Sequence, residues 1–376
     1  MLRVIHSVSV MNRAGQETFI MNIYRNINRE KVQFDFQCTK FENGDYDREI
    51  EALGGKILYL GENPIKLPFL KYLGDVYLQY HFFKNHKDYN VFHIHTYHAF
   101  DAWLSIVGAK LAGMKNIVLH SHNSQGLHPK LHRIFRRLLP YMKIERFACS
   151  EMAAKWMFGE KEVRRGKVNI IKNGIVPEEF SFDEKERKLK REELGLEEKK
   201  IVGHIGRFSR QKNHEFLIDI FEAVHKKNPD AVLLLIGIGE LQERIRDKVK
   251  EKNLEEVVKF MGVRTDIKEL LWSMDVFLFP SLYEGLSVVA IEGQAAGVPI
   301  LAADTLSPET KITECINFLS LNEKLDKWSE RVLELSEYGH CYTIEDIKRA
   351  GYDITVTAHI LEEKYIEISK TQRRNR

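Results

Sequence analysis

The chain lacks the segments that would place it in or across a membrane. Among its 376 residues there is no run of about eighteen apolar residues, the length that crossing a bilayer needs. The N-terminus, Met-Leu-Arg-Val-Ile-His-Ser-Val, has the pattern of a first strand. It has neither the long apolar region nor the small-residue cleavage site of a signal peptide. We therefore expect a cytoplasmic protein that does not span a membrane.

Cysteine is also scarce, and the few cysteines are scattered. Their spacing matches no metal-binding pattern, and it fits free buried thiols in a reducing cytoplasm. The four positions are Cys38, Cys149, Cys315 and Cys341.

The net charge is small, +3, but it is unevenly distributed along the chain. Residues 1–177 contain 26 Lys and Arg against 16 Asp and Glu, and the remaining residues contain 31 against 38. A basic N-terminal half suggests an anionic partner, which would be a phosphate group, an anionic lipid or a nucleic acid. A solvated surface with a chance imbalance explains the distribution equally well. Nucleic acid is the least favoured partner, because the basic residues are not interleaved with aromatic residues in one motif.

Short apolar runs alternate with longer helical patterns along the whole chain. Such non-alternating, β-branched runs predict parallel sheets that are covered on both faces, and two series of them predict two doubly wound α/β domains. The expected strands are Leu2–Val8, Gln33–Cys38, Lys56–Leu60, Val91–His95, Asn116–His120, Arg146–Cys149 and Val168–Ile171 in the first series, and Ile201–Ile205, Ala231–Ile236, Val257–Met261, Val276–Phe279, Pro299–Ala302 and Cys315–Leu319 in the second.

A polar segment from Val176 to about Lys200 separates the two series. Its stretch from Asp183 to Arg191 mixes charges of both signs, which predicts a solvated helix. Near the end of the chain, apolar residues recur with a helical period from Ile354 to Ile368.

Two glutamates frame a turn between a strand and a helix near residue 285. The expected strand ends at Phe279, Glu284 lies in the turn, and Glu292 lies on a helix expected from about Ser287 to Ala296. Backbone N–H groups are free at a helix N-terminus, which favours an anion there. A carboxylate on each side of such a turn suits a ligand with hydroxyls on both sides of its phosphates, such as a nucleotide sugar. Two solvated surface glutamates are the simpler interpretation, and only the neighbouring motifs favour a site.

A cluster of cations follows the first strand of the second series. The strand leads into Gly206-Arg207-Phe-Ser-Arg-Gln-Lys212-Asn-His. Arg207 would bind a diphosphate as a fork and Lys212 as a point charge. A basic surface loop is the alternative, and the two glutamates in the same domain favour the diphosphate clamp. After another strand, the backbone near Val263 is well placed to hydrogen-bond the edge of a base.

Strand ends in the N-terminal half carry further candidates. The loop from Asn12 to Thr18, around Gly15, leads into a helix expected over Phe19–Asn26. It lacks the glycine triplet of a dinucleotide fingerprint, so a ligand loop and a simple turn remain equally good interpretations. Histidines gather after two strands, and the strand-end position favours a functional role for His95 and His122, whereas His93 and His120 are expected in core or supporting roles. A metal site at these histidines is conceivable, but none is predicted, because no carboxylate or cysteine shares the histidine spacing.

The segment 128–143 has the pattern of a basic amphipathic helix. Apolar residues at Leu127, Leu131, Ile134 and Leu138 form one stripe, with arginines on the other faces. A helix packed on the sheet and a helix attached to an anionic membrane both remain open interpretations.

Taken together, these residues resemble the retaining glycosyltransferases of family 4, which have the GT-B fold. The segment from Glu284 to Glu292 matches the most specific motif of that family. The Gly15 loop, the Gly206 loop and Lys172-Asn-Gly-Ile175 match in the expected order, so the resemblance covers nearly the whole chain. The sequence Val118-Leu-His-Ser-His-Asn-Ser is most similar to the EpsF-like exopolysaccharide or capsule branch.

The resemblance implies a domain plan. It is two Rossmann-like domains with a cleft between them and a C-terminal crossover helix. Residues 1–177 would bind the acceptor, with a helix of about 352–376 packed back on them, and residues 178–351 would bind the donor. The domains would close about a hinge at 174–178.

The resemblance also implies a nucleotide-sugar donor, UDP above all, and no cofactor. Glu292 would bind the ribose hydroxyls and Glu284 the hydroxyls of the donor sugar. Arg207 and Lys212 would neutralise the leaving diphosphate, and His122 would lie beside the transferred sugar. These last three residues and Glu284 form the expected catalytic set.

Further roles follow for glycines and backbone groups. Gly15 would let the first domain close over the diphosphate, and Val263 would approach the base through its backbone. The other expected donor-binding positions are Gly206, Gly285, Leu286 and Ser287. The acceptor-side candidates are His95, Asn123 and Asn173.

The chain departs from the family pattern at two places, neither of which removes a charged group. Ala14-Gly15 stands where the family usually has Gly-Gly, which bears on the conformation of that loop. Lys172-Asn173-Gly174 stands where Pro-Asn-Gly is usual.

The sequence therefore predicts retaining transfer of a sugar to a saccharide or a lipid-linked saccharide in surface polysaccharide synthesis. A location at the inner face of an anionic membrane would follow from the basic N-terminal half. Two alternatives stay open: a UDP-sugar epimerase on the same scaffold, and a non-catalytic nucleotide- or glycan-binding module. Intact Glu284, Glu292, Arg207 and Lys212 argue against the binding module.

Overall fold

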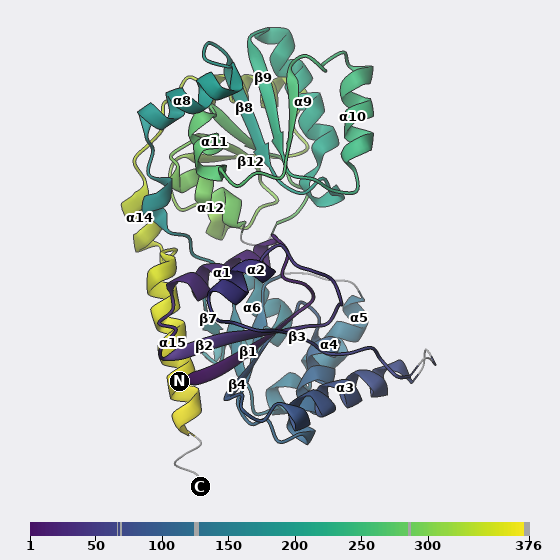
Figure 1. Ribbon diagram of the computed structural model, residues 1–376. Helices are drawn as coiled ribbons and strands as arrows, with labels where there is room; N and C mark the ends of the chain where they lie inside the picture. Colours follow the sequence, from purple (N-terminus) through teal and green to yellow (C-terminus); the bar gives the residue numbers. More distant parts are fainter. Residues whose placement is uncertain (66, 68–69, 124–127, 285–286, 372–376) are drawn as a thin grey trace. The chain divides into compact units, whose positions relative to one another are not determined.

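The computed structural model describes residues 1–376 except 66, 68–69, 124–127, 285–286 and 372–376. The contacts divide the chain into two compact units, shown in Figure 1. Unit 1 comprises Met1–Gly174 and Ile354–Arg376, and unit 2 comprises Ile175–Asp353. The division falls at Gly174, where the sequence led us to expect it after residue 177.

Unit 1 is built on a parallel sheet of seven strands in the order β3-β2-β1-β4-β5-β6-β7. Its strands are β1 (Leu2–Val8), β2 (Val32–Cys38), β3 (Ile57–Tyr59), β4 (Val91–His95), β5 (Ile117–Ser121), β6 (Glu145–Ala148) and β7 (Asn169–Ile170). Its helices are α1 (Gly15–Asn26), α2 (Asp47–Ala52), α3 (Lys71–Asn85), α4 (Ala99–Leu111), α5 (Pro129–Arg136), η1 (Leu139–Tyr141), α6 (Glu151–Phe158), α7 (Glu160–Arg164) and α15 (Ile354–Thr371).

The two faces of this sheet differ because successive side chains of a strand point to opposite sides. One face is apolar and packs with α3 and α4 through residues such as Ile5, Phe92 and Ile106. The opposite face carries histidines at alternate strand positions and is covered by α1 and α15. Figure 1 shows α15 running beside this part of unit 1. Its apolar stripe, which the helical period predicted, includes Tyr365, which is fully buried.

Unit 2 is built on a parallel sheet of six strands in the order β10-β9-β8-β11-β12-β13. Its strands are β8 (Lys200–Ile205), β9 (Ala231–Ile236), β10 (Val258–Gly262), β11 (Val276–Phe279), β12 (Ile300–Ala303) and β13 (Ile316–Leu319). Its helices are η2 (Pro177–Phe180), α8 (Glu184–Leu194), η3 (Arg210–Lys212), α9 (His214–Lys227), α10 (Gln242–Glu251), α11 (Ile267–Ser273), α12 (Val288–Ala295), η4 (Pro308–Thr310), α13 (Leu325–Leu335) and α14 (Ile344–Arg349).

The predicted α/β class with two doubly wound Rossmann-like domains is confirmed, and every predicted strand is present with ends that agree to within one residue. The central strands of both sheets are buried on both faces, which explains why their sequences are apolar runs rather than alternating patterns. The edge strands β3, β7, β10 and β13 are mostly half-buried. No helix among the described residues has both the length and the hydropathy needed to cross a membrane.

Two helix predictions were wrong in detail. Helix α1 begins at Gly15 rather than at Phe19, because Ala14 already has the extended conformation of a helix cap. Helix α8 is not solvated all round: Lys190 and Arg191 are buried, and they form ion pairs with Asp266 and Asp275. The mixed charges along α8 therefore hold it against the rest of unit 2.

Each sheet has one place where the strand order reverses. In unit 1 the reversal lies between β1 and β4, and in unit 2 it lies between β8 and β11. The loops at the carboxyl ends of such a strand pair diverge to opposite faces of the sheet and leave a crevice for ligands. The predicted donor loops follow β8 and β11. In unit 1 the Gly15 loop follows β1, and His95 is the last residue of β4.

Candidate functional site

In unit 2 the loops after β8 and β11 are tied together. The backbone N–H of Leu282 donates to the carbonyl of Gln211 at 2.8 Å, and the Asn213 side chain donates to the carbonyl of Pro280 at 3.1 Å. At the same place Nζ of Lys212 lies 2.6 Å from Oε1 of Glu284. The structure thus brings together the two motifs that the sequence predicted for sugar and diphosphate.

Glycines make the β8 loop possible. A Cβ on Gly206 would lie 3.1 Å from the Lys212 side chain, so the glycine lets that side chain cross the loop. Gly237 has φ +129°, and a Cβ there would lie 2.3 Å from the carbonyl oxygen of Gly206. The glycine after β9 therefore supports the loop that carries the predicted diphosphate clamp.

The Lys212–Glu284 pair is almost entirely removed from solvent. The two side chains are 14% and 9% exposed, and the Lys212 ammonium lies 4.5 Å from the centre of the Phe279 ring. Charges in such a place interact strongly, and each is costly to leave without a partner. The pair therefore fixes the position of the cation that a diphosphate would meet.

Arg207 stands in a different environment on the same loop. Its side chain is 74% exposed, and its guanidinium lies 3.1 Å from Glu240. An exposed pair of this kind contributes little to stability. Arg207 is thus free to exchange Glu240 for another anion at small cost.

Helix α12 presents Ser287 and Glu292. Ser287 is buried at the helix N-cap, and its side chain makes no capping hydrogen bond, so the first N–H groups of α12 are not satisfied by it. Glu292 lies further along the helix, and burial raises the pKa of its carboxyl to about 7. The carboxyl group therefore changes charge near neutral pH. Gly285 and Leu286 lie outside the described residues.

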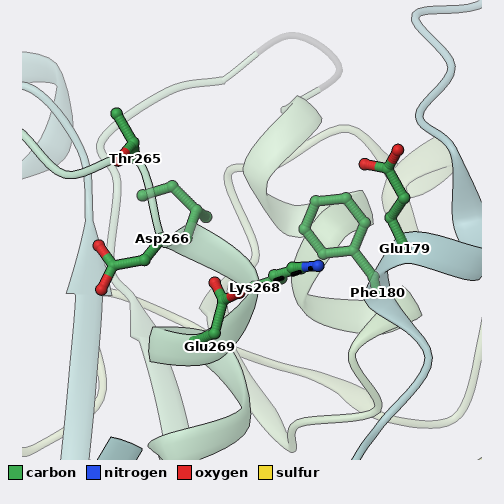
Figure 2. A pocket seen from close by; sticks show the side chains of 7 residues that line it. Glu179, Phe180, Thr265, Asp266, Lys268 and Glu269 are labelled. Atoms are coloured by element: carbon green, nitrogen blue, oxygen red, sulfur yellow. Dashed lines mark ion pairs between the residues drawn. The ribbon is translucent and has the colours of Figure 1, made fainter. Parts of the chain in front are cut away.

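Val263 follows β10 and is more than half exposed, and Gly262 before it has φ +64°. Near this strand end lies a hollow of about 370 Å³, shown in Figure 2. It is lined by Glu179, Phe180, Thr265, Asp266, Ile267, Lys268 and Glu269. None of the predicted donor residues that the structure describes lines this hollow, which is separate from the Lys212–Glu284 pair.

In unit 1, Gly15 is exposed at the N-terminus of α1, and a Cβ on it would meet no atom of the described residues within 4 Å. Two residues on, Glu17 is 9% exposed and hydrogen-bonds Gln16, and burial raises the pKa of its carboxyl. The sequence pattern indicates no role for Glu17, because a polar segment does not reveal that one of its side chains is buried next to an exposed helix start.

A chain of hydrogen-bonded histidines ends at His122. Nε2 of His122 lies 2.9 Å from Nδ1 of His95, and Nε2 of His95 lies 2.9 Å from Nδ1 of His6. His93 and His120 lie among them, and Nδ1 of His93 contacts the Tyr365 hydroxyl at 2.6 Å. Burial lowers the pKa of all five rings, to about 3 for His6 and His122, so they are neutral at neutral pH.

His6 was missed by sequence analysis because it lies inside the first strand. The parallel register pairs His6 with His93 and His95 with His120, which only the sheet order reveals. His98, by contrast, is not part of the chain of rings: its side chain caps α4 by accepting from the N–H of Phe100.

The acceptor-side candidates occupy three different environments. His95 is 6% exposed, and both of its ring nitrogens contact other histidines, so its observed contacts are those of a residue that supports His122. Asn123 is exposed. Asn173 is 5% exposed, and its Oδ1 has no hydrogen-bond partner in the described part of the chain. Contact of these residues with an acceptor stays a prediction.

The basic segment of unit 1 forms α5 and η1. The expected apolar stripe does not pack on the sheet: Ile134 is 58% exposed and Leu138 41%, and Leu127 lies outside the described residues. Instead, His132 and Leu139 are buried. Exposed apolar side chains therefore lie among the arginines of this segment.

Known glycosyltransferases are similar to this chain along nearly its whole length. The model of the family "Glycosyltransferase Family 4" matches residues 13–179, and that of "Glycosyl transferases group 1" matches residues 186–342. The chain is 33% identical over 366 residues to the putative glycosyltransferase EpsF of Bacillus subtilis, covering 93% of each chain. It is 25% identical to the capsular polysaccharide biosynthesis glycosyltransferase CapH of Staphylococcus aureus, covering 99% of this chain and 100% of that protein.

Solved structures share the fold. The structure of HepE from Anabaena in complex with UDP and glucose matches with a TM-score of 0.73 at 18% identity, covering 100% of this chain and 99% of that one.

Proposed function

The chain belongs to the glycosyltransferases of family 4 with the GT-B fold, in their EpsF-like branch, and on this premise we propose that it transfers a sugar from a UDP-sugar with retention of configuration. The acceptor would be a saccharide or a lipid-linked saccharide in the synthesis of a surface polysaccharide. The name of its relative CapH, a capsular polysaccharide biosynthesis glycosyltransferase, supports this setting, and the UDP complex of HepE supports the choice of nucleotide.

The observation that carries the proposal is the meeting of the β8 and β11 loops at the strand-order reversal of unit 2. Lys212 lies there as a mostly buried cation, with Arg207 exposed on the same loop and the start of α12 close in sequence to Glu284. Cations and free backbone N–H groups are what a departing diphosphate requires. Glu284 and Glu292 would hold the hydroxyls of the sugar and the ribose.

In the proposed reaction the bond between the anomeric carbon and the diphosphate oxygen breaks. The acceptor hydroxyl oxygen forms the new bond to that carbon on the same face, and its proton passes to the departing diphosphate. Lys212 and Arg207 stabilise the charge that develops on the diphosphate. His122 would lie beside the transferred sugar as a neutral imidazole, because burial lowers the pKa of its ring to about 3.

A donor panel tests the proposal. UDP-, GDP- and ADP-sugars are titrated into the full chain by calorimetry, with thermal shift as a second readout. We expect UDP-sugars to bind and to raise the melting temperature, and binding of none of the nucleotides would refute the donor site.

Incubation with a UDP-sugar alone separates transfer from epimerisation. A transferase leaves the sugar's configuration unchanged and releases only slow hydrolysis products, whereas an epimerase converts the sugar to its epimer without any acceptor. Accumulation of an epimer would exclude the proposed reaction.

We also propose that α5 brings unit 1 to an anionic membrane surface. The support is the set of exposed apolar residues Ile134, Leu138 and Tyr141 beside exposed Arg133 and Arg137. Basic residues attract anionic lipid headgroups, and exposed apolar side chains enter the interface.

A further inference from the structure

Three histidines of unit 1 converge from two neighbouring strands. β4 and β5 pair with His95 opposite His120, and His122 follows two residues on, on the same face. One ring nitrogen of each lies within 4.8 Å of the others, and the closest measured pair, Nδ1 of His95 and Nε2 of His122, is 2.9 Å apart. We propose that this cluster, His95, His120 and His122, is a binding site for one divalent transition-metal ion of the zinc type.

The hydrogen bonding of the cluster points to an occupant. His120 is fully buried, and neither of its ring nitrogens has a partner among the described residues; Nδ1 of His122 lacks one as well. A buried polar group left without a partner costs about 1–3 kcal/mol. A metal ion that accepts the imidazole lone pairs removes part of that cost.

The contact between His95 and His6 fits the outer hydrogen bond of a metal ligand. If His95 binds through Nδ1, its Nε2–H can donate to Nδ1 of His6 at 2.9 Å. Metal-bound histidines usually make such an outer hydrogen bond, which fixes the ring and its tautomer.

The choice among the five histidines follows from access and free nitrogens. His6, His93 and His95 also lie close enough to share an ion, but all three are buried, and Nδ1 of His93 is already hydrogen-bonded to Tyr365. In the outer group His122 is half-buried, so this group lies nearer to solvent than the inner one.

The donor set selects the class of metal. Three imidazoles without a carboxylate suit Zn²⁺, Co²⁺, Ni²⁺ or Cu²⁺, whereas Mg²⁺ and Ca²⁺ prefer oxygen ligands. With metal–nitrogen bonds of about 2.0–2.1 Å, tetrahedral angles place two nitrogens about 3.3–3.4 Å apart. The 2.9 Å pair would open by a few tenths of an ångström, and the fourth position stays free for water or a ligand.

The test uses the full chain without a histidine tag, stripped with a chelator and dialysed against Zn²⁺ or Mg²⁺. Elemental analysis should find about one zinc per chain and no stoichiometric magnesium. Zinc should raise the melting temperature, because the ion joins β4 and β5, and a chelator should reverse the rise. Co²⁺ should give the visible absorption of a site with nitrogen ligands.

Variants locate the site. His122→Asn at the half-buried rim should weaken zinc binding by at least about 100-fold, more than the loss of an outer hydrogen bond causes. His120→Leu should do the same and keep the buried volume. His359→Ala is the matched control, since His359 is 67% exposed on α15 and should not affect binding.

Failure to bind zinc, or zinc binding that both His122→Asn and His120→Leu leave intact, would overturn the site. If His120→Leu does not fold, the His122→Asn result decides. The donor proposal is tested by nucleotide binding to unit 2, which neither outcome affects. Transfer is not a readout for zinc, because His122 would also lie beside the transferred sugar.

Discussion

Lys212 and Glu284 form an ion pair in which Nζ lies 2.6 Å from Oε1, and both side chains are nearly excluded from solvent. The pair joins the two loops that the family motifs mark as the donor site. A diphosphate that binds Lys212 therefore has to share its ammonium group with Glu284, whereas Arg207 meets only an exposed competitor, Glu240. The two cations should behave differently when they are removed.

Removal of Lys212 should damage both stability and transfer. Lys212→Ala leaves Glu284 mostly buried without its partner, which costs about 3–5 kcal/mol for a fully buried pair and somewhat less here. Transfer should fall by at least about 100-fold, because a cation is lost from the leaving diphosphate. Lys212→Ala with Glu284→Ala should regain much of the melting temperature but not the transfer.

Lys259→Ala, which removes an exposed lysine of the same unit, is the control. Normal transfer by Arg207→Ala with Lys212→Ala would remove the clamp from the mechanism.

Removal of Arg207 should weaken donor binding and leave the stability of the fold nearly unchanged. Because its ion pair is exposed, Arg207→Ala should change the free energy of unfolding by no more than about 0.5 kcal/mol. It should raise the KM for the donor. Glu240→Ala breaks the same ion pair from the other side and should leave donor binding unchanged or tighter. Equal losses in both variants would show that the ion pair, and not the cation, matters.

Donor binding should depend on the charge of Glu292. Its pKa, raised by burial to about 7, leaves roughly one carboxyl in ten ionised at pH 6 and nine in ten at pH 8. If the carboxylate accepts the ribose hydroxyls, affinity for UDP-glucose should rise about tenfold between these pH values. Glu292→Gln should give a flat profile. An equally steep profile in Glu292→Gln would assign the titration to another group.

The same pKa has a consequence for stability. The folded-state pKa lies above the ordinary value of 4.5, so the folded chain holds the proton more tightly than the unfolded chain. The stabilisation of the folded state by the protonated Glu292 carboxyl is therefore fully present below about pH 4.5 and is lost as pH rises through about 7. A UDP-sugar that binds the ionised form should offset part of that loss.

Substitution of Gly15 distinguishes a structural role of this glycine from a functional one. Its φ is not left-handed, and a Cβ would meet no atom of the described residues within 4 Å, so nothing in the described part of unit 1 requires a glycine there. If Gly15 allows close approach to the donor diphosphate, Gly15→Ala should keep the wild-type melting temperature and lower kcat/KM by at least about tenfold. Unchanged transfer would return this loop to a simple turn.

Membrane attachment should depend on Arg133 in α5 and on Arg137 directly after it. Each basic residue near an anionic surface contributes about 1 kcal/mol, so Arg133→Glu with Arg137→Glu should reduce co-sedimentation with anionic vesicles by at least about tenfold. Lys40→Glu with Lys167→Glu makes the same change in net charge at two other exposed positions of unit 1 and should bind almost normally. If the chain binds neutral and anionic vesicles equally, or neither, the proposal for α5 is wrong.

The sequence alone determined the sheet architecture and the family. Strands buried on both faces are written as short apolar runs, so each run marked a strand to within one residue. The spacing from Glu284 to Glu292 and the cations of the Gly206 loop were enough to predict donor residues, because each motif is local and lies within a single turn between a strand and a helix.

Only the tertiary structure decided which side chains meet. Lys212 and Glu284 are 72 residues apart, and His6 lies 89 residues from His95. Such contacts depend on strand order and register, which place His6 beside His93 and His95 beside His120. The structure also decided charge state, because the pKa of Glu292 and of the five histidines is set by burial. Burial is a property of the packed sheet and helices, and the spacing of residues along the chain does not express it.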